Sequence, residues 1–294
     1  MRHAAADTPL AGVPADLWTA AAAAAHRLLA LDYDGTLAPL RADRHAAVPL
    51  PGVVPAIGRI AAAARTTLAL VSGRPLADLD RLIAVPRTHA VGEHGWEQRA
   101  PDGPIVRHPL PDGCGPALAE AAGAAEARGW GSRLERKRAS VMLHTRGLAA
   151  EEAQAMAEAV RALWAPLAGR APLRLRPVDG GLELRAQGRD KGTAIRDLLA
   201  GCPSGTLAVY VGDDDTDEDV FRVLGSAGFG VRVARDERPT AARGRLRSCA
   251  GVLALLERWA ALPSAGAPAA PRAGPAGGAG PAGGAGTARG AGPA

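Results

Sequence analysis

The chain has 294 residues, 47% of them hydrophobic and 22% charged, so it can bury one large core or two modest ones. Its net charge of +5 comes from arginines scattered along the sequence, without a zinc finger or an aromatic-studded basic motif, which argues against nucleic acid as a partner. The cysteines at 114, 202 and 249 form no C-x-x-C pair and predict free thiols in a reducing compartment. No apolar segment is long enough for a signal peptide or a membrane span, so we expect a cytoplasmic protein without membrane attachment.

The first part of the chain alternates strands and helices. Residues 1–25 are predicted to form a loose lead-in and a short helix, and the pattern proper covers residues 26–108. Apolar runs predict strands, and amphipathic stretches between them predict helices. The strands are expected at 28–31, 67–71 and 89–91, and the helices at 53–64 and 76–83. This alternation is typical of βαβ units in a parallel sheet.

The pattern changes near Pro109, where a second module begins. Helices are expected at 117–128 and 151–167, and short strands at 132–135, 140–145, 173–177 and 182–185. The last two strands form a hairpin across Asp179-Gly180-Gly181. The order α-β-β-α-β-β predicts an antiparallel sheet with helices on one face. Residues 109–186 are therefore interpreted as an α+β domain inserted into the α/β domain.

The βα pattern resumes over residues 187–262 and completes the predicted α/β core begun by residues 26–108. Helices are expected at 191–200, 218–224 and 252–261, and strands at 207–211 and 229–233. Residues 263–294 consist mainly of Ala, Gly and Pro, with no acidic and no large apolar residue. Such a segment cannot repay its ordering entropy, so we predict a disordered tail.

Acidic residues gather where two of the predicted strands end. Asp32 and Asp34 are two apart at the end of the first strand, so both point into the crevice where α/β sheets bind ligands. Asp213, Asp214, Asp215 and Asp217 follow the apolar run LAVYV. Such crowding is unfavourable unless a cation neutralises it, and oxygen ligands without Cys or His favour Mg²⁺. The alternatives are a surface Asp-Gly turn for the first pair and a solvated, helix-capping acidic loop for the second group.

Two further clusters suit a phosphate group. Ser72 with Gly73 ends the second strand, and Lys191 begins a helix. Of the 35 basic residues only Lys137 and Lys191 are lysines, which suggests a chemical reason for each. Mg²⁺ and Lys191 would offset phosphate charge, the Ser72 hydroxyl and backbone N–H groups would donate hydrogen bonds, and Asp32 could attack phosphorus.

The four clusters, in this order over residues 26–262, resemble the four signatures of haloacid-dehalogenase-like (HAD) phosphatases. The resemblance implies a Rossmannoid parallel-sheet core with an inserted cap. It implies that Asp32 is the nucleophile that forms an aspartyl-phosphate, and that Asp34 is the general acid and then the base. It further implies phosphate binding by Ser72, Gly73 and Lys191. Mg²⁺ would be held by Asp32, the backbone carbonyl of Asp34, Asp213 and Asp214, with Asp217 in support.

A finer pattern resembles the trehalose-6-phosphate phosphatases within that superfamily. It comprises Gly92-Glu93-His94-Gly95, then Leu134-Glu135-x-Lys137-x-x-Ser140-x-x-x-His144-x-Arg146, and Glu183-Leu184-Arg185 before Asp190-Lys191-Gly192. The resemblance implies that Glu135, Lys137 and Glu183 bind sugar hydroxyls, with His94 and Arg146 as further candidates. The alternatives are a cross-strand ladder of salt bridges in the cap and a satisfied loop histidine at position 94.

From this resemblance we expect a Mg²⁺-dependent hydrolase of trehalose 6-phosphate, with a small sugar phosphate as its ligand. A related phosphatase for sucrose 6-phosphate or a mannosyl phosphate is the alternative within enzymes. A catalytically silent domain that binds sugar phosphate or scaffolds a trehalose synthase is the alternative from another class. A trehalose-6-phosphate synthase is a possible protein partner, and a monomer is favoured.

Overall fold

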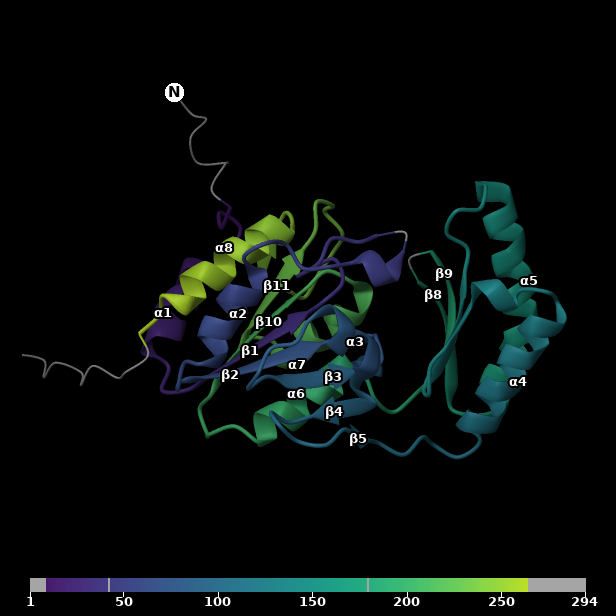
Figure 1. Cartoon of the computed structure of the whole chain (residues 1–294), viewed down its shortest axis with the longest axis horizontal. Helices are drawn as coiled ribbons and strands as arrows, with labels where there is room; N and C mark the ends of the chain where they lie inside the picture. Colours follow the sequence, from purple (N-terminus) through teal and green to yellow (C-terminus); the bar gives the residue numbers. More distant parts are fainter. Residues whose placement is uncertain (1–8, 42, 179, 264–294) are drawn as a thin grey trace, which may run out of the picture.

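The computed structural model describes residues 9–41, 43–178 and 180–263. It contains two sheets, each packed with its own helices, and we call these two parts of the molecule the core and the cap (Figure 1). Residues 1–8 of the predicted lead-in and nearly all of the predicted tail, residues 264–294, lie outside the described residues. No helix in the described ranges is long and apolar enough to cross a membrane.

The core is built on an eight-stranded sheet in the order β12-β11-β10-β1-β2-β3-β4-β5. The strands from β12 to β3 are parallel, whereas β4 and β5 are antiparallel to their neighbours. Their bounds are β1 Arg27–Asp32, β2 Thr66–Val71, β3 His89–Gly92, β4 Glu97–Arg99, β5 Val106–Arg107, β10 Leu207–Gly212, β11 Phe229–Val233 and β12 Gly244–Leu246. The strands β4, β5 and β12 were not predicted from the sequence, because strands of two or three residues carry no periodic signal.

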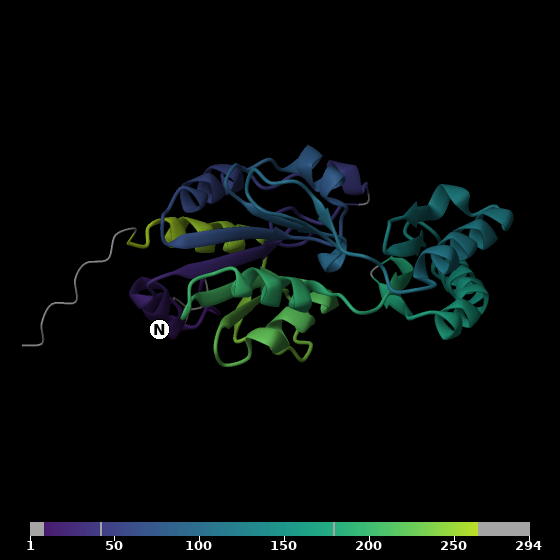
Figure 2. The ribbon, with the colours of Figure 1, turned by 90° about the horizontal axis from the view of Figure 1, so that it is seen from below.

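Helices cover both faces of this sheet, as Figure 2 shows with the sheet seen close to edge-on. The helices are α1 Ala15–Ala23, α2 Val53–Ala61, α3 Leu76–Leu82 and α8 Cys249–Ala260 on one face, and α6 Lys191–Ala200 and α7 Glu218–Leu224 on the other. Every residue of β1 is buried. Leu29 and Leu31 contribute to the first apolar layer, while Leu28 and Ala30 contribute to the second. A strand buried on both faces explains why its sequence is continuously apolar rather than alternating.

The cap is a four-stranded antiparallel sheet in the order β6-β7-β9-β8, with two helices on one face. Its elements are α4 Cys114–Ala127, β6 Leu134–Arg136, β7 Ser140–His144, α5 Ala150–Arg170, β8 Leu173–Val178 and β9 Gly181–Ala186. Val141, Leu143 and Leu184 pack with Trp164 of α5, whose Nε1 donates to the Ala121 carbonyl oxygen at 3.0 Å. The opposite face of the sheet is polar, and Figure 1 shows the strands on the side of the cap that faces the core.

Candidate active site

The site forms where the parallel strands end. Asp32 is the last residue of β1, and its neighbours in the sheet are Val71, the end of β2, and the end of β10. Residues that directly follow these strands, Ser72 and Asp213, therefore lie beside Asp32 although they are far from it in sequence. This is the carboxyl edge at which open α/β sheets bind ligands.

Lys191, the first residue of α6, joins two carboxylates in the interior. Its Nζ donates to Asp32 Oδ1 at 2.6 Å and to Asp217 Oδ1 at 2.7 Å, and the lysine is 3% exposed. Burial alone would lower the pKa of Lys191, but Asp217 and Asp32 outweigh it and raise the pKa, so the ammonium stays charged. Asp217 also accepts from Tyr210 Oη at 2.6 Å and from the Asp214 backbone N–H at 2.8 Å. Its carboxylate is thus already occupied by protein donors, and it positions the lysine.

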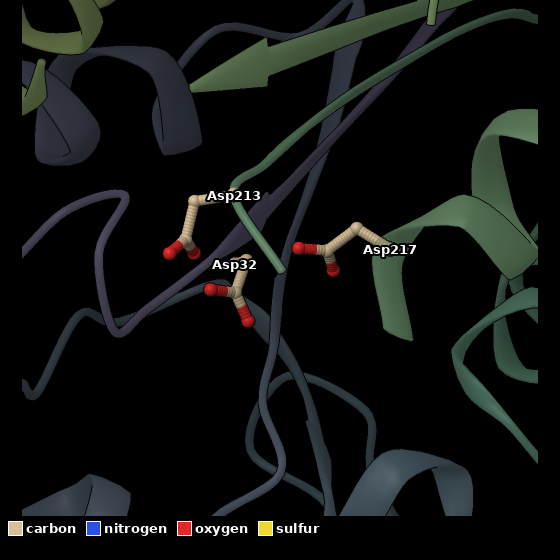
Figure 3. Close-up of side chains that lie close together, drawn as sticks. All are labelled: Asp32, Asp213 and Asp217. Carbon is tan, nitrogen blue, oxygen red and sulfur yellow. The ribbon is translucent and has the colours of Figure 1, made fainter. Parts of the chain in front are cut away.

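Three carboxylates, those of Asp32, Asp213 and Asp217, meet at the strand ends (Figure 3). One oxygen of each lies within 4.8 Å of the others. Burial raises the pKa of Asp32 well above its usual range; Asp217 and Asp213 act in the same direction, while Lys191 opposes them. Burial and then Asp217 also raise the pKa of Asp213, to about 7. The cluster therefore holds more negative charge than Lys191 offsets.

The carboxylate of Asp213 packs against Gly35, and any side chain at position 35 would displace this carboxylate. A Cβ on Gly35 would lie 1.9 Å from Asp213 Oδ2, and Gly35 has a φ of +73°, which disfavours side chains independently. Thr36 Oγ1 donates to Asp213 Oδ1 at 3.3 Å. Asp214 is exposed beside the cluster, where its carboxylate caps the short helix η4, Asp215–Asp217.

Asp34 is held by an arginine that the sequence analysis did not identify. Arg74 donates from Nε to Asp34 Oδ2 and from Nη2 to Oδ1, both at 2.6 Å. The guanidinium is buried, and Nη2 also donates to the Arg44 carbonyl oxygen at 2.8 Å. A bidentate pair of this kind fixes both oxygens of Asp34 in one plane.

Ser72 and Gly73 form a tight turn against His94. The Ser72 hydroxyl is buried and accepts from the Arg74 backbone N–H at 3.1 Å. A Cβ on Gly73 would lie 2.5 Å from the His94 ring, so only glycine allows the imidazole this close. Burial and then the charges of Arg185 and Lys191 keep the pKa of His94 well below its usual range, so the ring is neutral at pH 7. Its Nδ1 is buried with no hydrogen-bond partner among the described residues.

The loop that carries His94 also ties the core to the cap. Glu93 and His94 have positive φ angles of 46° and 55°, which are strained for residues with side chains. The Glu93 carboxylate accepts from the backbone N–H groups of Arg138 at 3.1 Å and Ala139 at 2.9 Å, in the turn between β6 and β7. We infer that the strain positions Glu93 on the cap. This loop matches a family pattern in the sequence, but the contact of Glu93 with the cap was not predicted.

The polar face of the cap brings Glu135, Lys137 and Glu183 together. Lys137 Nζ lies 3.4 Å from Glu135 Oε1 and 4.0 Å from Glu183 Oε1. Glu183 accepts from Ser140 Oγ at 2.8 Å, and Glu135 Oε2 lies 2.9 Å from His144 Nε2.

Arg44, in the core loop after β1, crosses to the cap and pairs with Glu135 as well as with Asp78. Burial opposes ionisation of Glu135, but the hydrogen bond from His144 and the charges of Lys137 and Arg44 lower its pKa. Arg44 was not identified from the sequence, and no motif marks it. Arg74 did carry a signal, because it directly follows Ser72-Gly73.

One cavity of about 210 Å³ collects the predicted residues between the core strand ends and the polar face of the cap. All of the predicted site residues line this cavity except Ser72 and Asp217, which are buried and do not reach it. Those that line it are Asp32, Asp34, Gly73, His94, Glu135, Lys137, Arg146, Glu183, Lys191, Asp213 and Asp214. The core side of this cavity offers the carboxylate of Asp32, a buried cation and further acids, while the cap side offers alternating hydrogen-bond donors and acceptors.

Solved structures resemble this chain in fold over most of its length. The C-terminal domain of the C. albicans trehalose-6-phosphate phosphatase superposes with a TM-score of 0.73 at 20% identity, covering 84% of this chain and 96% of that one. The Aspergillus fumigatus trehalose-6-phosphate phosphatase superposes with a TM-score of 0.60 at 27% identity, covering 84% and 97%. The predicted fold class, a HAD-like parallel-sheet core with helices and an inserted α+β cap, is confirmed.

Proteins related in sequence belong to the same class as these solved structures. The trehalose-phosphate phosphatase of Mycobacterium marinum is 35% identical over 241 residues, which are 78% of this chain and 60% of that protein. That of Mycobacterium avium is 37% identical over 250 residues, 80% of this chain and 62% of that protein. The chain thus spans about 60% of the length of these relatives. Residues 30–248 match the family model of trehalose-phosphatase, so the chain belongs to the trehalose-phosphatase family.

Proposed function

We propose that this chain is a Mg²⁺-dependent phosphatase that hydrolyses trehalose 6-phosphate to trehalose and phosphate through an aspartyl-phosphate on Asp32. The observation that carries the proposal is the single cavity in which the Asp32–Lys191 pair faces Glu135, Lys137 and Glu183. Membership of the trehalose-phosphatase family supports both the reaction class and the substrate.

The first chemical step is assigned to Asp32. One of its carboxylate oxygens attacks phosphorus, an O–P bond to Asp32 forms, and the bond between phosphorus and the sugar C6 oxygen breaks. Lys191, held 2.6 Å from Asp32, offsets the negative charge that the phosphate brings into a buried site. Gly73, on the cavity wall, is assigned to bind phosphate oxygens through backbone N–H groups.

Asp34 is assigned two opposite roles. In the first step it gives a proton to the leaving sugar oxygen, and in the second it takes a proton from the water that hydrolyses the aspartyl-phosphate. The carboxylate held by Arg74 suits the second role. To deliver a proton in the first step, the Asp34 carboxyl has to be protonated and released from the Arg74 guanidinium. The Asp34 side chain is 32% exposed, so it has room to move away from Arg74.

The residues present suit Mg²⁺. The donors are carboxylates without Cys or His among them, Asp213 is cradled by Gly35, and burial raises the pKa of both Asp32 and Asp213. Asp32, Asp213 and the Asp34 carbonyl would hold the ion, with Asp214 at the rim. Asp217, already saturated by Lys191 and Tyr210, acts in support. When bound, the ion would supply positive charge to the phosphoryl group.

The cap residues are assigned to the sugar. Glu135 and Glu183 are acceptors, Lys137 between them is a donor, and a neutral disaccharide offers hydroxyl groups that can meet both. Without a sugar these side chains satisfy one another and Ser140, His144 and Arg44, which is the structural ladder considered as the alternative. Arg146 and His94 line the same cavity and stay predicted sugar contacts.

Location and partners stay predictions. The three cysteines are free thiols, which fits the expected reducing cytoplasm. The predicted monomer and the possible trehalose-6-phosphate synthase partner are likewise proposals.

The substrate assignment is tested by phosphate release from trehalose 6-phosphate, sucrose 6-phosphate, a mannosyl phosphate and an aryl phosphate. We expect kcat/KM for trehalose 6-phosphate to exceed the other sugar phosphates by about tenfold or more, since unpaired cap groups penalise a poor fit. EDTA should remove activity and Mg²⁺ should restore it. A preference for another sugar would contradict the substrate, and no release from any would favour the silent binding domain.

The covalent mechanism is tested by Asp32→Asn. We expect kcat to fall by more than about 10³-fold, because the amide is no nucleophile. Substrate carrying ³²P should leave acid-stable label on the wild-type chain and none on the variant. Asp80→Asn, which alters a surface acid paired with Arg99, is the matched control and should keep both activity and label. Retained turnover in Asp32→Asn would refute the mechanism.

The Mg²⁺ site is tested by Gly35→Ala. The new Cβ collides with Asp213, so we expect Mg²⁺ affinity measured by calorimetry to fall by about 10–100-fold. Gly205→Ala is the matched control: its φ of +75° brings the same left-handed strain, about 1–2 kcal/mol, but a Cβ there meets nothing within 4 Å. Equal Mg²⁺ affinity in the two variants would show that Asp213 does not hold the ion.

The sugar contacts are tested by Glu135→Ala and Lys137→Ala. We expect KM for trehalose 6-phosphate to rise about tenfold or more, while kinetics with the aryl phosphate change little, because that substrate does not reach the cap. Arg136→Ala is the control, since Arg136 points to the opposite side and pairs with Glu126 of α4. Equal losses on both substrates would favour the structural ladder.

A further inference from the structure

A second cavity, of about 490 Å³, lies between the cap strands β8 and β9 and the core helix α7, with Asp190, the residue before α6, also lining it. Figure 1 shows these strands on the side of the cap that faces the core. Among residues 9–41, 43–178 and 180–263, none lines both this cavity and the catalytic one. The second cavity is thus a separate compartment of the space between cap and core, and the mechanism above makes no use of it.

The cap wall of this cavity carries three arginines on adjacent positions of one sheet face. Arg174 of β8 is directly opposite Arg185 of β9, and Arg176 is two residues further along β8 on the same face. Like charges in directly opposed positions repel one another. In the part of the chain that the structure describes, none of the three side chains makes a hydrogen bond or an ion pair.

Arg185 makes this repulsion costly. It is only 7% exposed, and its Nη1 is buried without a hydrogen-bond partner in the described residues. A buried charge is unfavourable unless an opposite charge or a full set of hydrogen bonds compensates it. The guanidinium lines the cavity, so a ligand entering there can supply the missing anion.

The core wall is acidic, but its carboxylates are already engaged. Asp215 pairs with Arg238 at 2.6 Å, and Asp219 with Arg222 at 3.2 Å. Asp190 accepts from the Thr193 backbone N–H, and Glu218 accepts from Thr240 Oγ1 and the Ala241 backbone N–H. Burial lowers the pKa of Arg185, and the nearby charges of Glu183, Asp219 and Asp190 oppose this only in part, since none of these acids forms an ion pair with Arg185 among the described residues. The oxygens of the core-wall acids still have lone pairs that can accept hydrogen bonds from hydroxyl groups.

We propose that this cavity is a second binding site, for a phosphorylated polyol of sugar-phosphate size. The phosphate would lie on Arg174, Arg176 and Arg185, and hydroxyl groups would donate to the carboxylates of the core wall. The volume falls in the range of small-molecule sites, about 300–1,000 Å³, and a bare phosphate would leave much of it unfilled. Since the ligand would contact β8 and β9 as well as α7, it would bridge cap and core. The proposal does not depend on the catalytic function proposed above.

The test is site-resolved protection of arginines in the full chain. Phenylglyoxal modification is followed by peptide mass spectrometry without ligand and with glucose 6-phosphate, inorganic phosphate or glucose. At a concentration about ten times its Kd, glucose 6-phosphate should slow modification of Arg174 and Arg176 about tenfold. Phosphate at the same concentration should protect less, and glucose not at all. Arg161, an exposed arginine on α5, is the internal control and should react unchanged.

Two variants separate this site from the catalytic cavity. Protection should disappear in Arg185→Gln and persist in Lys137→Ala. If Arg185→Gln does not fold, Arg176→Ala serves instead, with protection read at Arg174. Unprotected arginines in the wild-type chain, or protection lost only in Lys137→Ala, would overturn the proposal. Equal protection by phosphate and glucose 6-phosphate would overturn its polyol part.

Discussion

The buried contacts of Lys191 with Asp32 and Asp217 are the interaction on which the site depends. They join the end of β1, the start of α6 and the helix η4, which are separated by up to 185 residues in the chain. Removing one partner of such a pair leaves an uncompensated buried charge, which costs about 3–5 kcal/mol. Tyr210 and the Asp214 backbone complete the shell around Asp217. The lysine therefore sets the distance between the end of β1 and the helix η4 before any ligand arrives.

Around this pair, Asp34 and Glu135 have counter-charges that come from different parts of the molecule, whereas Asp213 has none among the described residues. Asp34 forms an ion pair with Arg74 of the core. Glu135 of the cap forms ion pairs with Arg44 of the core and Lys137 of the cap. The Arg44–Glu135 pair and the Glu93 carboxylate on the Ala139 N–H both cross from core to cap. In the function that we propose, phosphoryl chemistry and sugar recognition belong to these two domains, which the crossing contacts couple electrostatically.

Sequence reasoning succeeded where a residue's position follows from its neighbours in the chain. The acids at 32, 34 and 213 could be placed because each lies at or just after the end of a buried strand, and the strand ends of a parallel sheet meet at one edge. Arg44 and Glu93 could not be found, because their roles arise from contacts made across the interface between core and cap. In a chain whose positive charges are nearly all arginines, no single arginine stands out. The short edge strands β4, β5 and β12 were missed for a similar reason, since pairing rather than composition defines them.

The polar face of the cap sheet has two halves that differ in charge balance. Glu135, Lys137 and Glu183 neutralise one another over the catalytic cavity, and a neutral sugar can enter there by exchanging hydrogen bonds. Arg174, Arg176 and Arg185 lie on the same face. The acid of their own strands on this face, Glu183, is opposite Arg176 but accepts a hydrogen bond from Ser140 and lies near Lys137, so it does not neutralise the charge of all three arginines. One sheet face therefore presents a balanced half, suited to hydroxyl groups, and an unbalanced half, suited to an anion. A cap that needed only to close over the first cavity would gain nothing from burying Arg185 unpaired, and that cost is what points to a second ligand.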